Sequence, residues 1–240
     1  MNADPNQTTG TRKNRRPLIM AVTLLGMFMS VLDSMIIGIA LPTITEYFHA
    51  DIALSQWTMT AYLVAMTSTL LIFGKLSEYT GKERMFLAGM GVFTLASLGC
   101  ALAPTLPMLI ALRTVQGIGA AMAASIAMAL IIGLFSYKEH GKAMGALGAT
   151  IALASLTGGP VLGGFLIDLS GWESIFLINI PFGLLLLVTG GVCSMDLKKP
   201  ATGQIQMDWC GAAGLVMGIS GLMFFLGIVA GGVPLTAAVH

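Results

Sequence analysis

The sequence predicts an all-α integral membrane protein, built from a six-helix bundle and a seventh helix. Of its 240 residues, 56% are hydrophobic and only 10% are charged, far below the roughly 25% of charged residues in soluble domains. The apolar residues form seven runs of about 20 residues, the length that a helix needs to cross roughly 30 Å of hydrocarbon. The basic residues lie beside alternate connections between these runs.

Each run is interpreted as one membrane-spanning helix. The runs cover about 18–40, 55–73, 85–103, 107–135, 143–168, 174–195 and 209–230. They do not alternate apolar with polar residues, which favours helices over the strands of a membrane barrel. The first run is too long for a cleavable signal peptide, and the residues from Gly38 to Pro42 make a poor cleavage site, so we expect a retained helix.

The basic residues predict the orientation. Eleven of the twelve Lys and Arg residues precede the first run or follow the second, fourth and sixth runs, and only Arg113 lies inside a run. The positive-inside rule then places the N-terminus in the cytoplasm, with the chain in a cell membrane (inner or plasma). We expect a cytoplasmic basic tail (1–17, disordered and then membrane-anchoring), the bundle (18–195), a cytoplasmic linker (196–208), the seventh helix (209–230) and an extracytoplasmic tail (231–240).

Several function classes are disfavoured because their motifs are missing. Each Gly-Lys pair is followed by Leu, Glu or Ala, so the chain has no P-loop for ATP. The three histidines fall outside the runs and the three cysteines have no ligand spacing, so we expect no metal site, no cofactor and no enzyme activity. The net charge of +1 comes from basic residues spread along the chain, which gives no reason to expect a nucleic-acid partner.

Two charged residues lie where the membrane makes a charge costly. Asp33 is about 15 residues into the first run and Arg113 about six into the fourth, which runs in the opposite direction, so the two share a depth. One interpretation is a structural ion pair between two helices. The other is a proton site, in which the acid titrates and the arginine tunes it, and the spacing does not choose between them. Asp168, at the outer end of the fifth run, is interpreted as a solvated carboxylate.

Three further segments carry a family pattern: GKLSEYTGKER (Gly74 to Arg84), LRTVQGIGAAM (from Leu112) and GGPVLGG (Gly158 to Gly164). They resemble, in turn, the signature loop, the second signature and the antiporter motif of the major facilitator superfamily. LDSMIIGIALP, SQWTMTAYLVA, WESIFLINIPFG and MDWCGAAGLV are similar to segments of its fourteen-helix drug:proton antiporters of the EmrB/QacA type. The resemblance covers the N-terminal half of such a protein and implies two inverted three-helix repeats. Glu83 and Glu173 depart from the family pattern, which has basic residues there.

The resemblance and the chemistry together indicate candidate sites. Asp33 and Arg113 are expected to couple protons to transport. The signature loop is expected to reverse the chain tightly and hold an inward gate shut, the alternative being a solvated charged loop. A kinked, closely packed helix is expected at the antiporter motif, the alternative being ordinary membrane-helix packing. The expected residues are Gly74, Glu78, Gly81, Lys82 and Arg84 in the gate loop, Gly159, Pro160, Gly163 and Gly164 in the antiporter motif, and Gln56, Tyr62, Gln116 and Gly117 in the cavity.

The expected function is proton-coupled antiport that exports small amphipathic or cationic compounds, with these 240 residues as a partial chain. Two alternatives stay open: an exporter of a dedicated metabolite or siderophore, and a membrane fragment without transport of its own, because seven helices are too few for two six-helix bundles. The implied partners are a drug-like small molecule, protons, the lipid bilayer, the C-terminal half of the transporter or a second copy, and a periplasmic adaptor.

Overall fold

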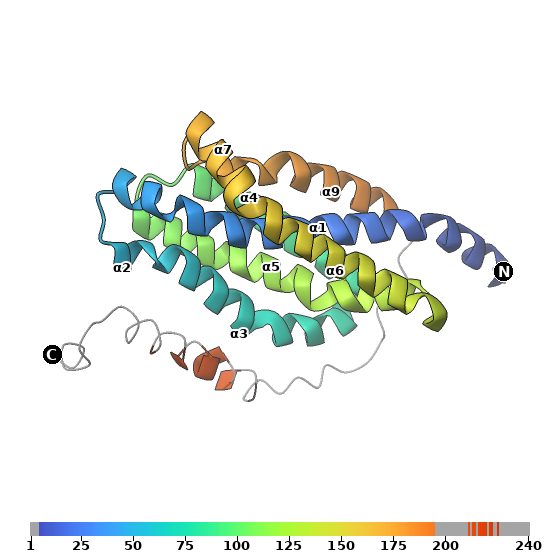
Figure 1. The fold of residues 1–240 in the computed structure, drawn as a ribbon. Coiled ribbons are helices and arrows are strands. Elements are labelled where there is room, and N and C mark those ends of the chain that lie inside the picture. Colours follow the sequence, from blue (N-terminus) through green and yellow to red (C-terminus); the bar gives the residue numbers. More distant parts are fainter. Residues whose placement is uncertain are drawn as a thin grey trace.

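A computed structural model of the chain describes residues 5–194 and, beyond them, residues 211, 213–214, 216–219, 221–222 and 225. Within these residues every regular element is a helix, as the composition predicts (Figure 1). In chain order the elements are α1 (Pro5–Tyr47), α2 (Ile52–Ser55), α3 (Trp57–Thr80), α4 (Lys82–Ala101), α5 (Leu106–Leu134), η1 (Tyr137–Glu139), α6 (His140–Leu156), η2 (Thr157–Val161), α7 (Leu162–Ser170), α8 (Ser174–Leu177) and α9 (Asn179–Ser194).

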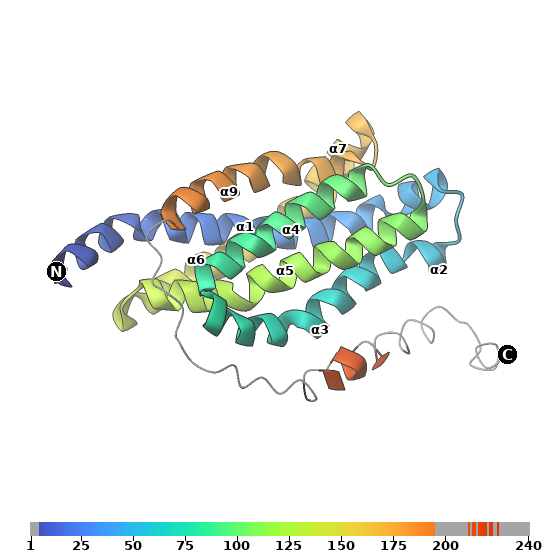
Figure 2. The ribbon, with the colours of Figure 1, turned by 180° about the vertical axis from the view of Figure 1, so that it is seen from behind.

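The long helices lie side by side and reverse direction at alternate ends of the bundle (Figures 1 and 2). Helix α5 packs along both α3 and α4, while α1 contacts α5, α6 and α9. In Figure 1 the α6–α7 segment crosses in front of α1, and Figure 2 shows α4 and α9 on the opposite side. Helix α1 therefore has the most neighbouring elements, and α5 lies between α3, α4 and α1.

Five helices are long and apolar enough to cross a membrane: Arg16–Tyr47, Ile52–Thr80, Lys82–Ala101, Leu106–Gly133 and Ser174–Gly191. They match five of the predicted runs. The predicted run at 143–168 is helical but not a single α-helix, because a π-helical turn, η2, separates α6 from α7. Pro160 lies within η2 and supplies no backbone N–H, which is a common cause of such an interruption.

Two predicted boundaries of the first helix are wrong. Helix α1 begins at Pro5, so the tail expected to be disordered is helical from that residue on. It also continues to Tyr47, through Pro42, although a connection was expected from residue 41. Pro42 lies within two turns of the helix end, where the one backbone hydrogen bond that it removes interrupts little of the helix.

The predicted loop of about ten residues at 74–84 is also wrong. Helix α3 runs to Thr80 and α4 begins at Lys82, so only Gly81 lies outside both. Gly81 has φ of +94°, a conformation that glycine adopts at little cost. The expected tight reversal is therefore confirmed at Gly81. Gly74 instead lies inside α3, where its backbone faces Ser125 of α5.

The predicted seventh helix, at 209–230, lies mostly outside the described residues, as do the linker at 196–208 and the tail at 231–240. The described residues of this stretch, which begin at Gly211, are helical.

The buried interior has two main apolar clusters, and buried polar residues lie between them. Along α1, Met29 belongs to one cluster and Ile36 to the other, with Asp33 between them. Along α4, Phe93 and Cys100 flank Ser97 in the same way. Every described basic residue from Arg16 on except Arg113 lies toward one end of the bundle, as the count along the sequence predicts: Arg16, Lys75, Lys82, Arg84, Lys138 and Lys142.

Candidate functional site

Asp33 and Arg113 meet in the middle of the bundle. The Arg113 Nη1 atom donates to Asp33 Oδ2 at 2.5 Å, which joins α5 to α1. The two side chains are 0% and 1% exposed, so water does not solvate either charge. The shared depth predicted from the sequence is confirmed, and the two residues form one buried ion pair.

Gln116, one turn after Arg113 on α5, links both members of the pair. Its Oε1 accepts from Arg113 Nη1 at 2.6 Å, and its Nε2 donates to Asp33 Oδ1 at 3.0 Å. The same Nε2 donates to Ser97 Oγ of α4 at 2.7 Å. The predicted cavity residue Gln116 is therefore a buried partner of the charges.

Asn179 completes the set from α9. Its Nδ2 donates to Asp33 Oδ1 at 2.9 Å and lies 3.4 Å from Ser97 Oγ. We call the five residues Asp33, Ser97, Arg113, Gln116 and Asn179 the polar layer; each is at most 1% exposed. Four long helices contribute to it. Most polar atoms of the layer thus find partners within the protein, as burial away from water requires, whereas Arg113 Nη2 has no hydrogen-bond partner among the described residues.

Sequence reasoning missed Ser97 and Asn179. Both lie in long apolar runs, where hydroxyl and amide side chains commonly bond between helices. Asn179 lies in the segment WESIFLINIPFG, and a polar residue in an apolar run could have been predicted from the sequence to bond between helices.

Aromatic rings cover the guanidinium group. The ring centroid of Tyr62, on α3, lies 4.3 Å from Arg113 Cζ, and that of Phe176, on α8, lies 5.8 Å away. A cation attracts the electron-rich face of an aromatic ring, and the attraction strengthens where water is absent. Arg113 Nε also donates to the backbone carbonyl of Thr58 at 3.1 Å, so the arginine has several partners besides Asp33.

The chemistry available to the layer is proton binding. A carboxylate paired with a cation is neutral as a pair, and addition of a proton leaves one positive charge on the arginine. That charge keeps the Gln116 and Thr58 oxygens as acceptors. Among the described residues no group of three or more His, Cys, Asp or Glu side chains is placed to hold a metal ion.

The antiporter-motif glycines lie against α1 beside this layer. A side chain on Gly158 would approach the Leu32 carbonyl oxygen to 3.0 Å, and one on Gly163 would approach Ile36 Cγ1 to 3.0 Å. The expected close packing is therefore confirmed for Gly163, and Gly158 makes the second close contact. Gly164 has open space around it. Gly159 and Pro160 lie within η2, next to Gly158.

The predicted gate charges make a local contact. Glu78 accepts from Lys75 Nζ at 2.6 Å, one turn earlier on α3, and both side chains are about half exposed. Glu78, one of the predicted gate residues, thus forms an ion pair within its own helix. Lys82 and Arg84 are exposed in the first turn of α4.

Two predicted cavity residues do not line a cavity. Gln56 is exposed at the junction of α2 and α3, and its side chain is absent from the polar layer. Gly117 is buried against the Tyr62 backbone, and any side chain there would collide with the Tyr62 carbonyl oxygen. Gly117 is therefore a helix-packing residue. Asp168 is exposed at the end of α7, as expected for a solvated carboxylate.

A groove of about 440 Å³ lies between α3 and α5. This volume is within the usual range for small-molecule sites. Tyr62 and Arg113 lie on the same two helices, but their side chains are buried rather than part of the groove wall. The lining is apolar with three hydroxyl groups: Trp57, Ala61, Val64, Ala65, Ser68, Thr69, Ile110, Thr114 and Ile118.

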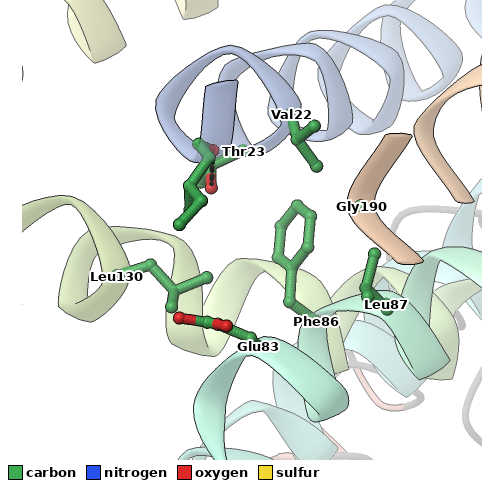
Figure 3. Close-up of a pocket in the computed structure, with 8 residues that line it drawn as sticks. Val22, Thr23, Glu83, Phe86, Leu87, Leu130 and Gly190 are labelled. Atoms are coloured by element: carbon green, nitrogen blue, oxygen red, sulfur yellow. Dashed lines mark hydrogen bonds between the residues drawn. The ribbon is translucent and has the colours of Figure 1, made fainter. Parts of the chain in front are cut away.

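A second pocket, in Figure 3, is far smaller. Its volume is about 20 Å³, room for roughly one water molecule. Figure 3 shows Phe86, Leu87, Leu130 and Val22 around it, with the Glu83 carboxylate at its edge. This pocket is too small for a transported compound, so the α3–α5 groove is the better candidate for a binding surface.

Comparisons with known proteins find a family model and several named relatives. A family model described as Major Facilitator Superfamily matches residues 23–208. The chain is 36% identical over 173 residues to the riboflavin transporter RibZ of Clostridioides difficile, covering 72% of this chain and 38% of that protein. It is 32% identical over 216 residues to the multidrug transporter protein MdtP of Bacillus subtilis, covering 90% and 39%. The chain thus spans less than two fifths of either relative.

A solved structure has the same fold. The inward-open xylose transporter XylE of E. coli superposes with a TM-score of 0.63 at 18% sequence identity. The match covers 87% of this chain and 54% of that one.

Proposed function

We propose that this chain, which belongs to the major facilitator superfamily, is the N-terminal part of a proton-coupled antiporter that exports small amphipathic or cationic compounds. It is a multi-pass membrane protein and a transporter rather than an enzyme. The observation that carries the proposal is the buried Asp33–Arg113 pair within the polar layer. A charged residue at this depth is costly to bury and is found there mainly where it is paired, and ionisable residues inside the membrane often belong to proton relays.

The proposed cycle depends on the charge of Asp33. When Asp33 is ionised, the ion pair holds α1 against α5. A proton that adds to the carboxylate neutralises it and removes the attraction, while Arg113 keeps its contacts to Gln116 and Thr58. The contact between α1 and α5 then weakens, which biases the bundle toward another arrangement.

The antiporter motif is proposed to transmit this change. Gly158 touches the backbone at Leu32, the residue before Asp33, and η2 is an irregular turn that can adjust. The half-exposed Lys75–Glu78 pair and the hinge at Gly81 belong to the proposed gate at the basic end of the bundle. By the positive-inside rule we assign that end, with the N-terminus, to the cytoplasm of a cell membrane.

The α3–α5 groove is proposed as part of the substrate path. Its wall offers Trp57 and hydroxyl groups but no charged side chain, which suits flat amphipathic molecules. The relative named as a multidrug transporter favours broad specificity. The relative named as a riboflavin transporter supports the second candidate, an exporter of one dedicated metabolite with a planar ring system. A C-terminal half, or a second copy of this chain, would close the path, and a periplasmic adaptor is a further proposed partner.

The test separates a proton site from a structural ion pair. The intact transporter containing this chain is reconstituted in vesicles, and export of ethidium or riboflavin is driven by an imposed pH gradient. Asp33→Asn should bind the compound but lose driven export, and the double variant Asp33→Asn/Arg113→Gln should do the same. Asp168→Asn, an exposed carboxylate, is the matched control. Driven export by the folded double variant would show that the pair is structural only.

Residues 1–240 by themselves are expected not to transport, because no second bundle closes the α3–α5 groove into a path across the membrane. Export by this segment alone, dependent on Asp33, would overturn the view that it needs a second half. Intact wild-type transporter that exports neither compound but exports another metabolite would favour the dedicated exporter.

A further inference from the structure

We propose that Asn179 is a positioning residue for the proton site, which fixes Oδ1 of Asp33 and directs the incoming proton to Oδ2. The inference rests on the proposed proton-coupled function and assigns a residue of α9 a role in it. Asn179 is the first residue of α9 and is 1% exposed. An amide buried this deeply is costly without hydrogen bonds, and both its observed contacts are to the polar layer.

The two carboxylate oxygens have different partners. Oδ2 accepts from Arg113 Nη1 at 2.5 Å. Oδ1 accepts from two neutral amides, Asn179 Nδ2 at 2.9 Å and Gln116 Nε2 at 3.0 Å. One oxygen therefore faces the cation, and the other faces two N–H groups from two helices.

Ser97 fixes the orientation of both amides. Its hydroxyl donates to the Phe93 carbonyl oxygen at 2.8 Å, so its single proton is used and its oxygen can only accept. The amide groups near it, at 2.7 Å for Gln116 and 3.4 Å for Asn179, must therefore present N–H rather than C=O. The same two nitrogens then face Asp33 Oδ1.

This orientation selects the oxygen that takes the proton. A proton on Oδ1 would point at two N–H donors, which cannot turn to accept it while Ser97 holds them. Oδ2 accepts one hydrogen bond, from Arg113, and keeps a lone pair that an added proton can occupy, so the proton adds to Oδ2. The positive charge stays on Arg113, and Oδ1 remains bound to Asn179, so protonation breaks the ion pair while the contact between α1 and α9 persists.

Few ionisable groups face Asp33. Arg113 approaches from α5, Tyr62 from α3 and Cys100 from α4. In the described part of α9, the contact to Asp33 comes from Asn179 and is neutral. Substitution of Asn179 therefore changes the hydrogen bonding of Asp33 without removing an existing charge.

The experiment follows the protonated Asp33 carboxyl group by infrared spectroscopy in the intact transporter in acid, without any transported compound. The carboxyl C=O band is assigned by its loss in Asp33→Asn. If the proton is on Oδ2, Oδ1 is the carbonyl oxygen and accepts hydrogen bonds from Asn179 and Gln116. In Asn179→Leu and in Asn179→Ala that oxygen loses one N–H donor, so the band should move to higher wavenumber. Ser174→Ala, a buried hydroxyl bonded only to backbone carbonyls of its own region, is the control and should not move it.

The outcomes separate this inference from the proposed function. An unmoved C=O band in both folded Asn179 variants would overturn the positioning role, even if Asp33→Asn abolishes proton-driven export. Driven export that survives in Asp33→Asn would instead overturn the proposed function. A band that moves to higher wavenumber in the Asn179 variants, with the control unchanged, supports the positioning role.

Discussion

Removal of one charge of the Asp33–Arg113 pair should destabilise the bundle more than removal of both. Arg113→Gln leaves a carboxylate that is 1% exposed with no cation beside it. Asp33→Asn leaves the positive charge of Arg113 buried without a carboxylate beside it. Arg113 Nη1 then faces the neutral amide that replaces the carboxylate, through either its N–H or its oxygen. The double variant has two neutral amides, which can bond to each other as well as to Gln116 and Asn179.

The magnitude follows from the burial of the pair. Loss of one partner of a buried ion pair typically costs about 3–5 kcal/mol, because the other charge stays buried and uncompensated. Replacement of both charges by neutral groups of similar size is often close to neutral. We therefore expect each single variant to lose about 3 kcal/mol or more of unfolding free energy, and the double variant to recover most of that loss.

The assay is denaturant unfolding of the intact, detergent-purified transporter, followed by circular dichroism for the wild type, both single variants and the double variant. The interaction energy of the cycle isolates the pair from other changes at the two positions. If the losses of the two single variants simply add in the double variant, the pair contributes no coupling and the reasoning from burial is wrong.

Two further predictions concern packing and pH. Gly119→Ala should destabilise the bundle by roughly 1–3 kcal/mol or more, because the added carbon would lie 2.6 Å from the Phe93 backbone nitrogen. Thermal unfolding measures this loss. Gly133→Ala, in the same helix with open space around it, is the control and should have little effect. Hydrogen bonds from the side chain and backbone of Ser136 lower the pKa of Glu139, so its capping contact should be present at neutral pH and lost as the pH falls through that lowered value. Hydrogen exchange of the Ser136 amide checks this: protection that vanishes in acid is expected in the wild type, and Glu139→Ala should lack it at every pH.

The sequence predicted the helical class and the shared depth of Asp33 and Arg113 because both follow from simple physics. A membrane-spanning run must be helical, and a helix rises a fixed distance per residue, so two residues at known positions in antiparallel runs have comparable depths. Packing decides which face each helix turns toward the other. A run in which nearly every residue is apolar has no periodicity from which that face could be predicted. The pair was therefore predicted as possible, and its hydrogen-bond partners were not predicted.

Helix ends were the weakest predictions, for a related reason. Hydropathy marks where apolar residues stop, but α3 continues for seven residues beyond the predicted end of its run, through Lys75 and Glu78 to Thr80. Those side chains pair with each other at the end of the helix, so the backbone can stay helical where the sequence turns polar. Gly81 is the residue between α3 and α4, and its role in the reversal of the chain could be predicted because it is a glycine.

The close contact at Gly158 gives the polar layer its connection to the rest of the bundle. Asp33 and Leu32 are adjacent on α1. The side chain of Asp33 belongs to the polar layer, and the backbone of Leu32 contacts Gly158 in η2. Because a helix is stiff over one residue, any displacement of α1 that follows a change in the Asp33 charge must also change the contact at Leu32. A regular helix with a side chain at position 158 would resist that displacement, whereas a glycine within a π-turn leaves room for it. If the proposed proton coupling operates, the GGPVLGG segment and the ion pair act on adjacent residues of α1, and substitutions at either are expected to alter the same conformational change.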